Sequence, residues 1–236
     1  MNILVTGCSR GVGLEICRVL LEQGHTVYGV ARSCPDEFVT LQKQYSERLF
    51  YKSVDLSDSE HVRENVFGDF CSNKVRLDGF VNNAAIAYDD IVSNINLDRL
   101  KTMYDVNVFS PMVMTKYAIR NMLLHHTKGS IVHISSISVH TGYKGLAMYA
   151  SSKGALEAFS KNTAREWGSL GIRSKCGCAG IHADSDERYL DGRTESKDLC
   201  AYFIKGRDIG SFGCGECGVL VERKGRKHNR SEYSCR

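Results

Sequence analysis

A tyrosine and a lysine in the second half of the chain have the residue types and the spacing needed for proton transfer. Tyr149 and Lys153 stand four residues apart in the stretch MYASSKGAL, so in a helix both side chains lie on one face. A phenol with a pKa of about 10 is a poor acid or base at neutral pH, but a neighbouring ammonium group favours the phenolate. Ser136, at the end of the preceding apolar run, can donate a hydrogen bond to a carbonyl oxygen. The three residues predict acid–base chemistry on a carbonyl or an alcohol.

A glycine-rich turn near the start of the chain has the composition of a phosphate-binding site. Gly7, Gly11 and Gly13 lie in the stretch TGCSRGVGLEI, between an apolar run and a helical pattern. Small residues let the backbone approach a pyrophosphate, and the first turn of a helix offers unpaired N–H groups and a positive dipole end. The turn therefore predicts dinucleotide binding.

Two arginines favour a phosphorylated dinucleotide. NAD-binding proteins usually present an acid to the ribose hydroxyls at the end of the second strand, and this chain has Ala31 and Arg32 there, in VARS. Arg32 and Arg10 can both face a 2′-phosphate, whose oxygens suit the guanidinium fork. The pattern favours NADP(H) as the cofactor, and the alternative is that Arg32 is a solvated loop residue.

These residues need a scaffold of alternating strands and helices. Between residues 2 and 172, short apolar runs alternate with longer amphipathic stretches, and the strand candidates are NILVTG, TVYGVAR, LFYKSVD, LDGFVNNA and GSIVHISS. This alternation is typical of crossover units, in which parallel strands form one sheet with helices on both faces. We expect a single α/β domain of the Rossmann type, with a doubly wound parallel sheet in three α/β/α layers.

Over residues 1 to about 174 the chain resembles the classical short-chain dehydrogenase/reductase superfamily, which includes β-ketoacyl-acyl-carrier-protein reductases. The resemblance rests on TGCSRGVG for the motif TGxxxGxG, VDLSD, NNAA at 82–85, DVNVFSP, Ser136 and the Tyr149/Lys153 pair, in this order. It implies that the cofactor is bound by Gly7, Ser9, Arg10, Gly11, Val12, Gly13, Arg32, Asp55, Leu56, Asn83, Ala84, Tyr149 and Lys153.

The resemblance also implies a role for each catalytic residue. Tyr149 would protonate the carbonyl oxygen during hydride transfer, while Lys153 would hold the nicotinamide ribose and lower the pKa of the tyrosine. Ser136 would orient the substrate oxygen, and Asn107 would support a water-mediated proton relay to the lysine. The expected function is an NADPH-dependent oxidoreductase that interconverts a carbonyl and a secondary alcohol of a small molecule. A homo-oligomer, dimer or tetramer, is expected if the C-terminal region of the family is intact.

Composition argues against several other classes of protein. The chain has 236 residues, 42% of them hydrophobic and 25% charged, which suits one globular core. It begins MNILVTG without the regions of a signal peptide, and no run approaches the roughly 20 apolar residues of a membrane span. Six Lys/Arg and one acid fall in residues 223–236, so the net charge of +4 becomes about −1 without them. We expect a cytoplasmic protein that binds neither membranes nor nucleic acid.

The last quarter of the chain departs from this pattern, so we predict a domain at 1–174 and an atypical tail at 175–236. Six of the ten cysteines lie in the tail. Where the superfamily has an Asn, a Pro-Gly pair and a final strand near ITGQ, this chain reads KCGCAGIHADSD and KHNRSEYSCR. Codons read one nucleotide later from Lys175 onward permit both missing motifs. The hypothesis is that one extra nucleotide has displaced the reading frame.

Two alternative functions stay open. With a displaced frame, the chain is a non-catalytic or impaired nucleotide-binding product, because the tail replaces the substrate lid and the last strand. In the other alternative the tail is a functional appendage that binds zinc or nucleic acid. The zinc ligands would be Cys214, Cys217, His228 and Cys235, of which only the first pair has metal-site spacing. We favour the reductase, without a metal site.

Overall fold

The computed structural model describes residues 1–179 of the chain. Within them, six strands form one sheet in the order β3-β2-β1-β4-β5-β6, and every neighbouring pair is parallel. The strands are β1 (Asn2–Thr6), β2 (Thr26–Ala31), β3 (Leu49–Ser53), β4 (Gly79–Asn82), β5 (Ser130–Ser136) and β6 (Arg173–Ala179). The predicted doubly wound parallel sheet is confirmed.

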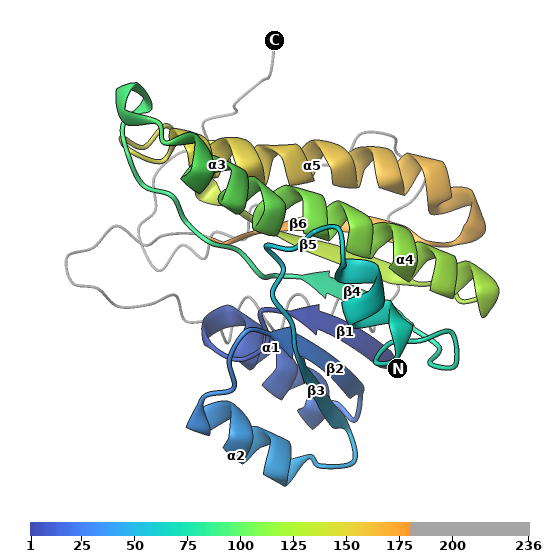
Figure 1. The fold of residues 1–236 in the computed structure, drawn as a ribbon. Helices are drawn as coiled ribbons and strands as arrows, with labels where there is room; N and C mark the ends of the chain where they lie inside the picture. The colour runs from blue at the N-terminus through green and yellow to red at the C-terminus, as the bar shows by residue number, and fades with distance from the viewer. Residues whose placement is uncertain (180–236) are drawn as a thin grey trace, which may run out of the picture.

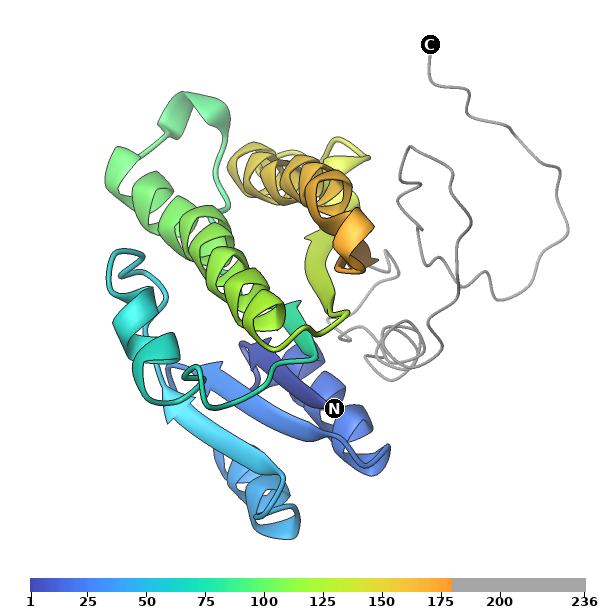
Figure 2. The same cartoon turned by 90° about the vertical axis from the view of Figure 1, so that its right-hand side faces the viewer.

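Helices cover both faces of the sheet, as Figures 1 and 2 show. One face carries α1 (Gly11–Glu22) and α2 (Asp36–Gln44), and the other carries α4 (Ser110–Leu124) and α5 (Ala147–Trp167). The remaining helical segments are α3 (Leu97–Tyr104), the π-helical turns η1 (Arg63–Gly68) and η3 (Asp105–Phe109), and the 3₁₀ turns η2 (Val92–Asn94), η4 (Ile137–Val139) and η5 (Gly168–Leu170). The three-layer α/β/α arrangement is therefore confirmed.

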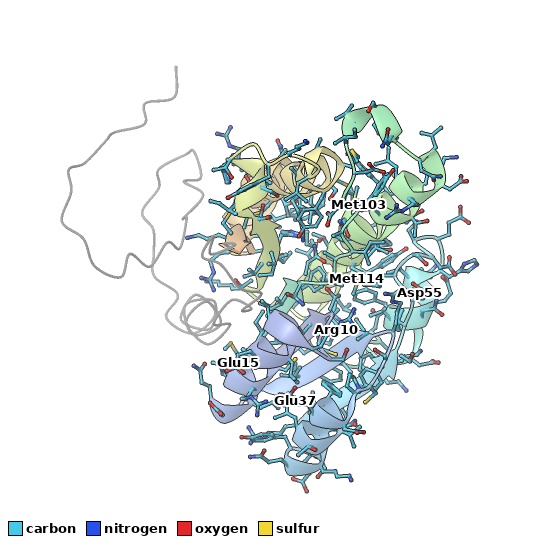
Figure 3. All side chains as sticks on the ribbon, turned by 90° about the vertical axis from the view of Figure 1, so that its left-hand side faces the viewer. Arg10, Glu15, Glu37, Asp55, Met103 and Met114 are labelled. Atoms are coloured by element: carbon cyan, nitrogen blue, oxygen red, sulfur yellow. The ribbon has the colours of Figure 1, made fainter. Side chains whose placement is uncertain are left out.

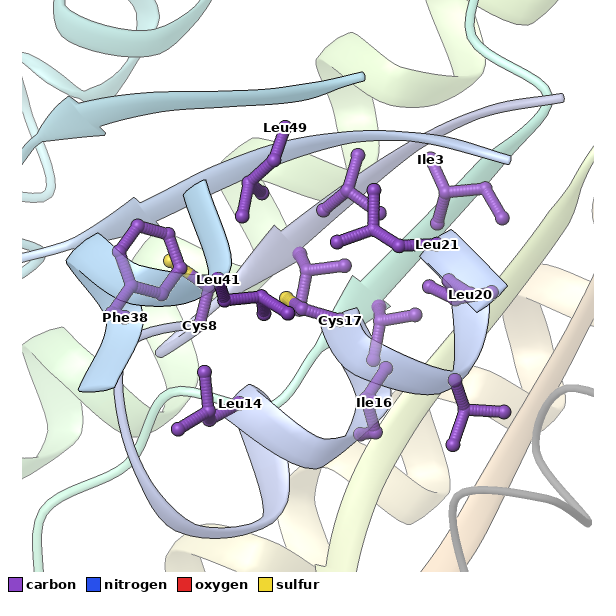
Figure 4. Packing of buried hydrophobic residues seen from close by; sticks show 14 of the residues in the cluster. Ile3, Cys8, Leu14, Ile16, Cys17, Leu20, Leu21, Phe38, Leu41 and Leu49 are labelled. Carbon is purple, nitrogen blue, oxygen red and sulfur yellow. The ribbon is translucent and has the colours of Figure 1, made fainter. Parts of the chain in front are cut away.

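Apolar side chains of α1, α2 and the first three strands form the core on one face. Figure 4 shows Leu14, Leu20 and Leu21 of α1 directed at the strands, with Phe38 and Leu41 of α2 beside them. Each fully buried Leu or Phe contributes about 1.5–3 kcal/mol to folding. Cys8 and Cys17 lie in the same cluster. This core fixes the position of α1, and with it the glycine turn.

A second core lies on the opposite face, beneath η1, α4 and α5. In β1, Ile3 belongs to the first core and its neighbour Leu4 to the second. Strands buried on both faces are typical of parallel sheets covered by helices, which explains why the apolar runs are nearly continuous. The turns after β1, β2, β4 and β5 are thereby brought to one edge of the sheet, on both sides of the point where the strand order reverses. Ligands of open α/β sheets bind at such an edge.

The sequence pattern does not predict β6. Its residues RSKCGCA alternate polar with small residues rather than forming an apolar run. The strand forms because β5 offers a row of backbone groups, and Ser130 to Ser136 pair in register with Arg173 to Ala179. The predicted domain boundary at 174/175 stays a prediction, and β6 contains residues on both sides of it.

Most predictions for the tail concern residues 180–236, which lie outside the described residues. These are the replaced lid and last strand and the ligands Cys214, Cys217, His228 and Cys235. Within residues 1–179, no helix combines the length and the apolar character needed to cross a membrane.

Candidate active site

A cleft of about 260 Å³ lies at the carboxyl ends of β1, β2 and β4. Ten of the predicted cofactor residues line it: Gly7, Ser9, Arg10, Val12, Gly13, Arg32, Asp55, Leu56, Asn83 and Ala84. Figure 3 looks toward this edge of the sheet and labels Arg10 and Asp55 there. Gly11, Tyr149 and Lys153 are not part of the lining. Six lining residues are not among the predicted cofactor residues, although all but Ile86 lie in the quoted motifs: Ala31, Ser33, Val54, Ala85, Ile86 and Val106.

The glycine turn is packed too closely for side chains at two positions. A Cβ on Gly13 would lie 2.0 Å from the carbonyl oxygen of Gly7 and 2.5 Å from Nδ2 of Asn83. Gly7 itself has φ +64°, in the left-handed region that favours glycine. Asn83 Nδ2 donates to the carbonyl oxygens of Thr6 (3.0 Å) and Gly7 (3.2 Å). The turn after β1 is therefore clamped against the turn after β4, and the backbone lies open to the cleft.

The start of α1 keeps its backbone donors available for an anion. Arg10 precedes the helix without a side-chain cap, and no acidic residue lies in the first turn. In α3, by contrast, Oδ1 of Asn96 accepts from the backbone N–H groups of Asp98 and Arg99 at 3.0 Å. Uncapped N–H groups and the positive end of the helix dipole make a helix start an anion site. A pyrophosphate fits here.

The charged groups of the cleft remain in contact with water. Arg10 and Arg32 are both exposed. Asp55 lines the same cleft, and its pKa is lowered mainly because the backbone N–H of Ser57 donates to Oδ1 at 2.9 Å, with a smaller contribution from Arg32. The cleft thus offers two guanidinium groups and one ionised carboxylate, which suit a phosphate and the hydroxyl or amino groups of a nucleotide.

A chain of buried polar side chains supports the cleft from behind, and no motif predicts it as a unit. Oγ1 of Thr6 accepts from the backbone N–H groups of Asn83 and Ala84, both at 3.0 Å, and donates to Oδ1 of Asn82 at 3.4 Å. Asn82 Nδ2 lies 3.2 Å from Nδ1 of His133. Burial lowers the pKa of His133 to about 3, so the ring is neutral. This series of hydrogen bonds joins β1, β4 and β5.

The predicted catalytic side chains gather at the end of β5 and the start of α5. Ser136 is the last residue of β5, and its Oγ accepts from the Ser138 N–H (3.2 Å) and hydroxyl (3.0 Å). Tyr149, in the first turn of α5, packs against the buried Tyr88 and Met103. Lys153, one turn later, is 2% exposed. Ser136 thus lies at the end of a strand, and Tyr149 and Lys153 lie at the start of a helix, as the sequence predicts.

The ammonium group of Lys153 is held by a backbone carbonyl of β5. Its Nζ donates to the carbonyl oxygen of Ile134 at 2.8 Å and lies 5.8 Å from the centre of the Tyr149 ring. Burial lowers the pKa of Lys153 to about 8. Burial also raises the pKa of Tyr149, and the carboxylate of Asp89 adds to this effect. Burial thus has the largest effect on the pKa of Tyr149, and the expected lowering of that pKa by Lys153 stays a prediction. The phenol stays protonated at neutral pH.

Asn107 connects the two sides of the site. It lies in η3 and is fully buried; π-helical turns of this kind often occur at functional sites. Its Oδ1 accepts from the N–H of Ile86 (2.9 Å), and its Nδ2 donates to the carbonyl oxygen of Ile86 (2.9 Å) and to Oγ of Ser152 (3.0 Å). Among the hydrogen bonds within residues 1–179 none joins Asn107 directly to Lys153, so the relay through water stays a prediction.

Comparison with known proteins identifies relatives of the chain. The profile of the family described as "short chain dehydrogenase" matches residues 1–188. An L-xylulose reductase of Caenorhabditis elegans is 32% identical over 172 residues, which are 73% of this chain and 68% of the relative. A 3-oxoacyl-acyl-carrier-protein reductase of Buchnera aphidicola is 31% identical over 169 residues, covering 72% of this chain and 68% of the relative.

Several solved structures have a fold similar to that of this chain. A serine dehydrogenase from Escherichia coli superposes with a TM-score of 0.76 at 22% identity, covering 86% of this chain and 91% of its own. A 4-hydroxyisoleucine dehydrogenase complexed with NADH has a TM-score of 0.70 at 26% identity, covering 76% and 73%. The closed form of a serine dehydrogenase complexed with NADP⁺ also has a TM-score of 0.70, at 24% identity, covering 85% and 79%.

Proposed function

The chain belongs to the short chain dehydrogenase family of oxidoreductases, and we propose that it interconverts a carbonyl and a secondary alcohol of a small molecule with NADPH as the cofactor. The relatives named above include reductases of a sugar and of a 3-oxoacyl thioester. Both names denote substrates with a ketone carbonyl. The proposal leaves the substrate of this chain open within that class.

The position of Lys153 is the observation that carries the proposal. A lysine with 2% exposure is costly unless its ammonium group has a partner, and here the partner is a carbonyl of β5, two residues before Ser136. This contact holds the ammonium group one helical turn from Tyr149, at the edge of the sheet where the cleft opens. A buried lysine whose partner within residues 1–179 is a backbone carbonyl is typical of a functional site rather than of a stabilising ion pair.

Each residue has a separate role in the proposed reaction. Arg10, Arg32 and the first N–H groups of α1 bind the phosphates of the dinucleotide. When bound, the cofactor supplies a hydride in reduction and accepts one in oxidation. Tyr149, which is protonated at neutral pH, donates its hydroxyl proton to the carbonyl oxygen, and Ser136 orients that oxygen by a hydrogen bond. Lys153 replenishes the proton and stabilises the phenolate that forms.

A two-stage experiment tests the proposal on the full chain. Fluorescence titration with NADPH and NADH comes first, and we expect tighter binding of NADPH. NADPH oxidation is then followed with L-xylulose, a 3-oxoacyl thioester and a set of simple ketones. Failure to bind either nucleotide would overturn the proposal.

The second stage also decides between the enzyme and an impaired nucleotide-binding product. A chain that binds NADPH and reduces none of the carbonyls supports the impaired product, provided that the chain with the corrected reading frame is active in the same assay. A homo-oligomeric assembly and a cytoplasmic location belong to the same proposal, and size-exclusion chromatography of both chains tests the first of them.

A further inference from the structure

Three side chains with metal-binding atoms meet beside the catalytic residues. They are His140, which follows η4, Glu157 in α5 and Cys178 in β6, and one nitrogen, oxygen or sulfur atom of each lies within 4.8 Å of the others. The side chain of His140 is 33% exposed, whereas that of Glu157 is 6% exposed and Cys178 is buried. The cluster is thus closed on the side of the sheet and open to solvent at the histidine.

The fold brings these three residues together through the pairing of β5 with β6. Ser135 of β5 is the register partner of Cys178, and its Oγ donates to Oε1 of Glu157 at 2.5 Å. Nε2 of His140 lies 3.1 Å from the same carboxylate oxygen. The helix α5 packs across both strands, as Figure 1 shows. Glu157 is therefore held above the strand pair, with the histidine and the cysteine close to it.

We propose that His140, Glu157 and Cys178 form a Zn²⁺ site. Imidazole nitrogen, carboxylate oxygen and thiolate sulfur are the ligands that zinc uses in proteins, whereas a thiolate does not suit Mg²⁺ or Ca²⁺. A neutral imidazole, one carboxylate and one thiolate give a net charge of −2, which a divalent cation neutralises. The exposed side of His140 leaves a fourth position for water.

The geometry requires only a small contraction on binding. Zn–N, Zn–O and Zn–S contacts of roughly 2.0–2.3 Å put the ligand atoms of a tetrahedral site about 3.3–3.8 Å apart. The His140–Glu157 separation of 3.1 Å is already this short, and no pair exceeds 4.8 Å. Ser135 keeps its hydrogen bond to Glu157 and so orients the carboxylate, a function that partners of metal ligands often have.

The site would tie the turn after Ser136 to α5. His140 lies four residues beyond Ser136, and Glu157 lies one helical turn beyond Lys153. Bound zinc would thus link the chain segment after the serine to the helix that carries Tyr149 and Lys153, and stabilise the folded state. The inference does not depend on the proposed reductase activity, since it concerns metal binding alone.

Zinc titration of the full chain against a chromophoric chelator tests the site. The experiment uses a Cys214→Ser/Cys217→Ser background, which removes the CxxC pair of the tail. We expect one Zn²⁺ per chain in this background, and at least tenfold weaker binding after Cys178→Ser or His140→Ala. Cys176→Ser is the matched control, because Cys176 lies two residues earlier in β6 and contacts the same helix at the carbonyl of Leu156; it should bind zinc normally.

Cobalt provides an independent readout. Co²⁺ in the site should give a thiolate-to-metal charge-transfer band that disappears in Cys178→Ser and persists in Cys176→Ser. Circular dichroism of the metal-free variants establishes that each one is folded. Equal zinc affinity in Cys178→Ser and its background, or no bound zinc in a background protein that is folded, would overturn the proposal.

Discussion

The cofactor side of the site keeps its charged groups in water, whereas the catalytic side buries them. Arg10 and Arg32 are exposed, and the binding surface between them consists largely of backbone from the glycine turn. At the end of β5, by contrast, Ser136 and Lys153 are 5% and 2% exposed. Phosphate recognition needs N–H groups and cations that a large ligand can reach. Proton transfer needs groups whose pKa values differ from those in water.

The two sides also differ in the interactions that fix their residues in place. On the cofactor side, close backbone packing at Gly7 and Gly13 leaves no room for a Cβ, so the main chain itself is the proposed binding element. On the catalytic side, side chains from η3, α5 and β5 are fixed by hydrogen bonds, such as those from Lys153 to Ile134 and from Asn107 to Ser152. Substitutions on the catalytic side should therefore affect turnover, and substitutions on the cofactor side should affect cofactor binding.

The sharpest test of this difference is Tyr149→Phe, which removes the proposed proton donor and keeps the ring that packs on Tyr88. General acid catalysis contributes about 10²- to 10⁴-fold, so we expect turnover to fall by that factor while NADPH affinity stays unchanged. Steady-state kinetics and fluorescence titration measure the two quantities. Tyr117→Phe, in α4, is the control. If the Tyr149 variant kept more than a few per cent of wild-type turnover, another acid would have to be found.

Lys153 predicts a pH dependence of stability on the catalytic side. Its pKa is about 8 in the folded protein and 10.5 as an ordinary lysine. Between these values the unfolded chain holds a proton that the folded chain has lost, so the free energy of unfolding rises with pH. The rise amounts to about 3 kcal/mol, is complete above pH 10.5, and is lost as the pH falls through 8.

Urea unfolding of the wild type and of Lys153→Met at pH 8, 9 and 10 measures this contribution as a difference. The methionine variant lacks the titrating group and keeps most of the side-chain volume. We expect the stability of the wild type to increase relative to that of the variant across this range. Parallel stability curves would show that the lysine is charged in the folded protein and that the catalytic side is wetter than the structure indicates.

On the cofactor side, Gly13→Ala should disrupt the turn. The added Cβ would lie 2.0 Å from the carbonyl oxygen of Gly7, and forcing a methyl group into a packed site costs about 1–3 kcal/mol. We expect a lower thermal midpoint and a loss of NADPH binding. Gly168→Ala is the control, because no atom lies within 4 Å of its added Cβ and its φ of −61° suits alanine. An unchanged cofactor affinity in the Gly13 variant would argue against the turn as the phosphate site.

The smallest expected effect belongs to Arg32→Ala, since this residue is exposed to solvent. Loss of one charge-assisted contact with a 2′-phosphate should weaken NADPH binding by about tenfold, and NADH binding should not change. The contrast between the two nucleotides is the diagnostic quantity. Equal losses for both would indicate that Arg32 contacts a group that the two cofactors share, and the preference for NADPH would then rest on Arg10 alone.

Sequence alone determined the parallel sheet and most of the cleft. The apolar runs at β1, β2, β3, β4 and β5 could be identified because strands buried on both faces must be apolar nearly throughout. Ten of the residues that the resemblance to the superfamily implies for the cofactor do line one cleft, because the turns that follow parallel strands lie at one edge of the sheet. The Tyr149/Lys153 pair follows from helical spacing, which is a local property of the chain.

Tertiary structure alone decided the features that depend on distances between remote segments. β6 forms because β5 presents a pairing edge, although its own residues are not apolar. The chain from Thr6 through Asn82 to His133 and the cluster of His140, Glu157 and Cys178 each join three elements. The pKa of Tyr149 is raised because the phenol is buried, and the carboxylate of Asp89 adds to the effect. Desolvation is set by everything packed around a group, and the residue spacing within one helix does not contain that information.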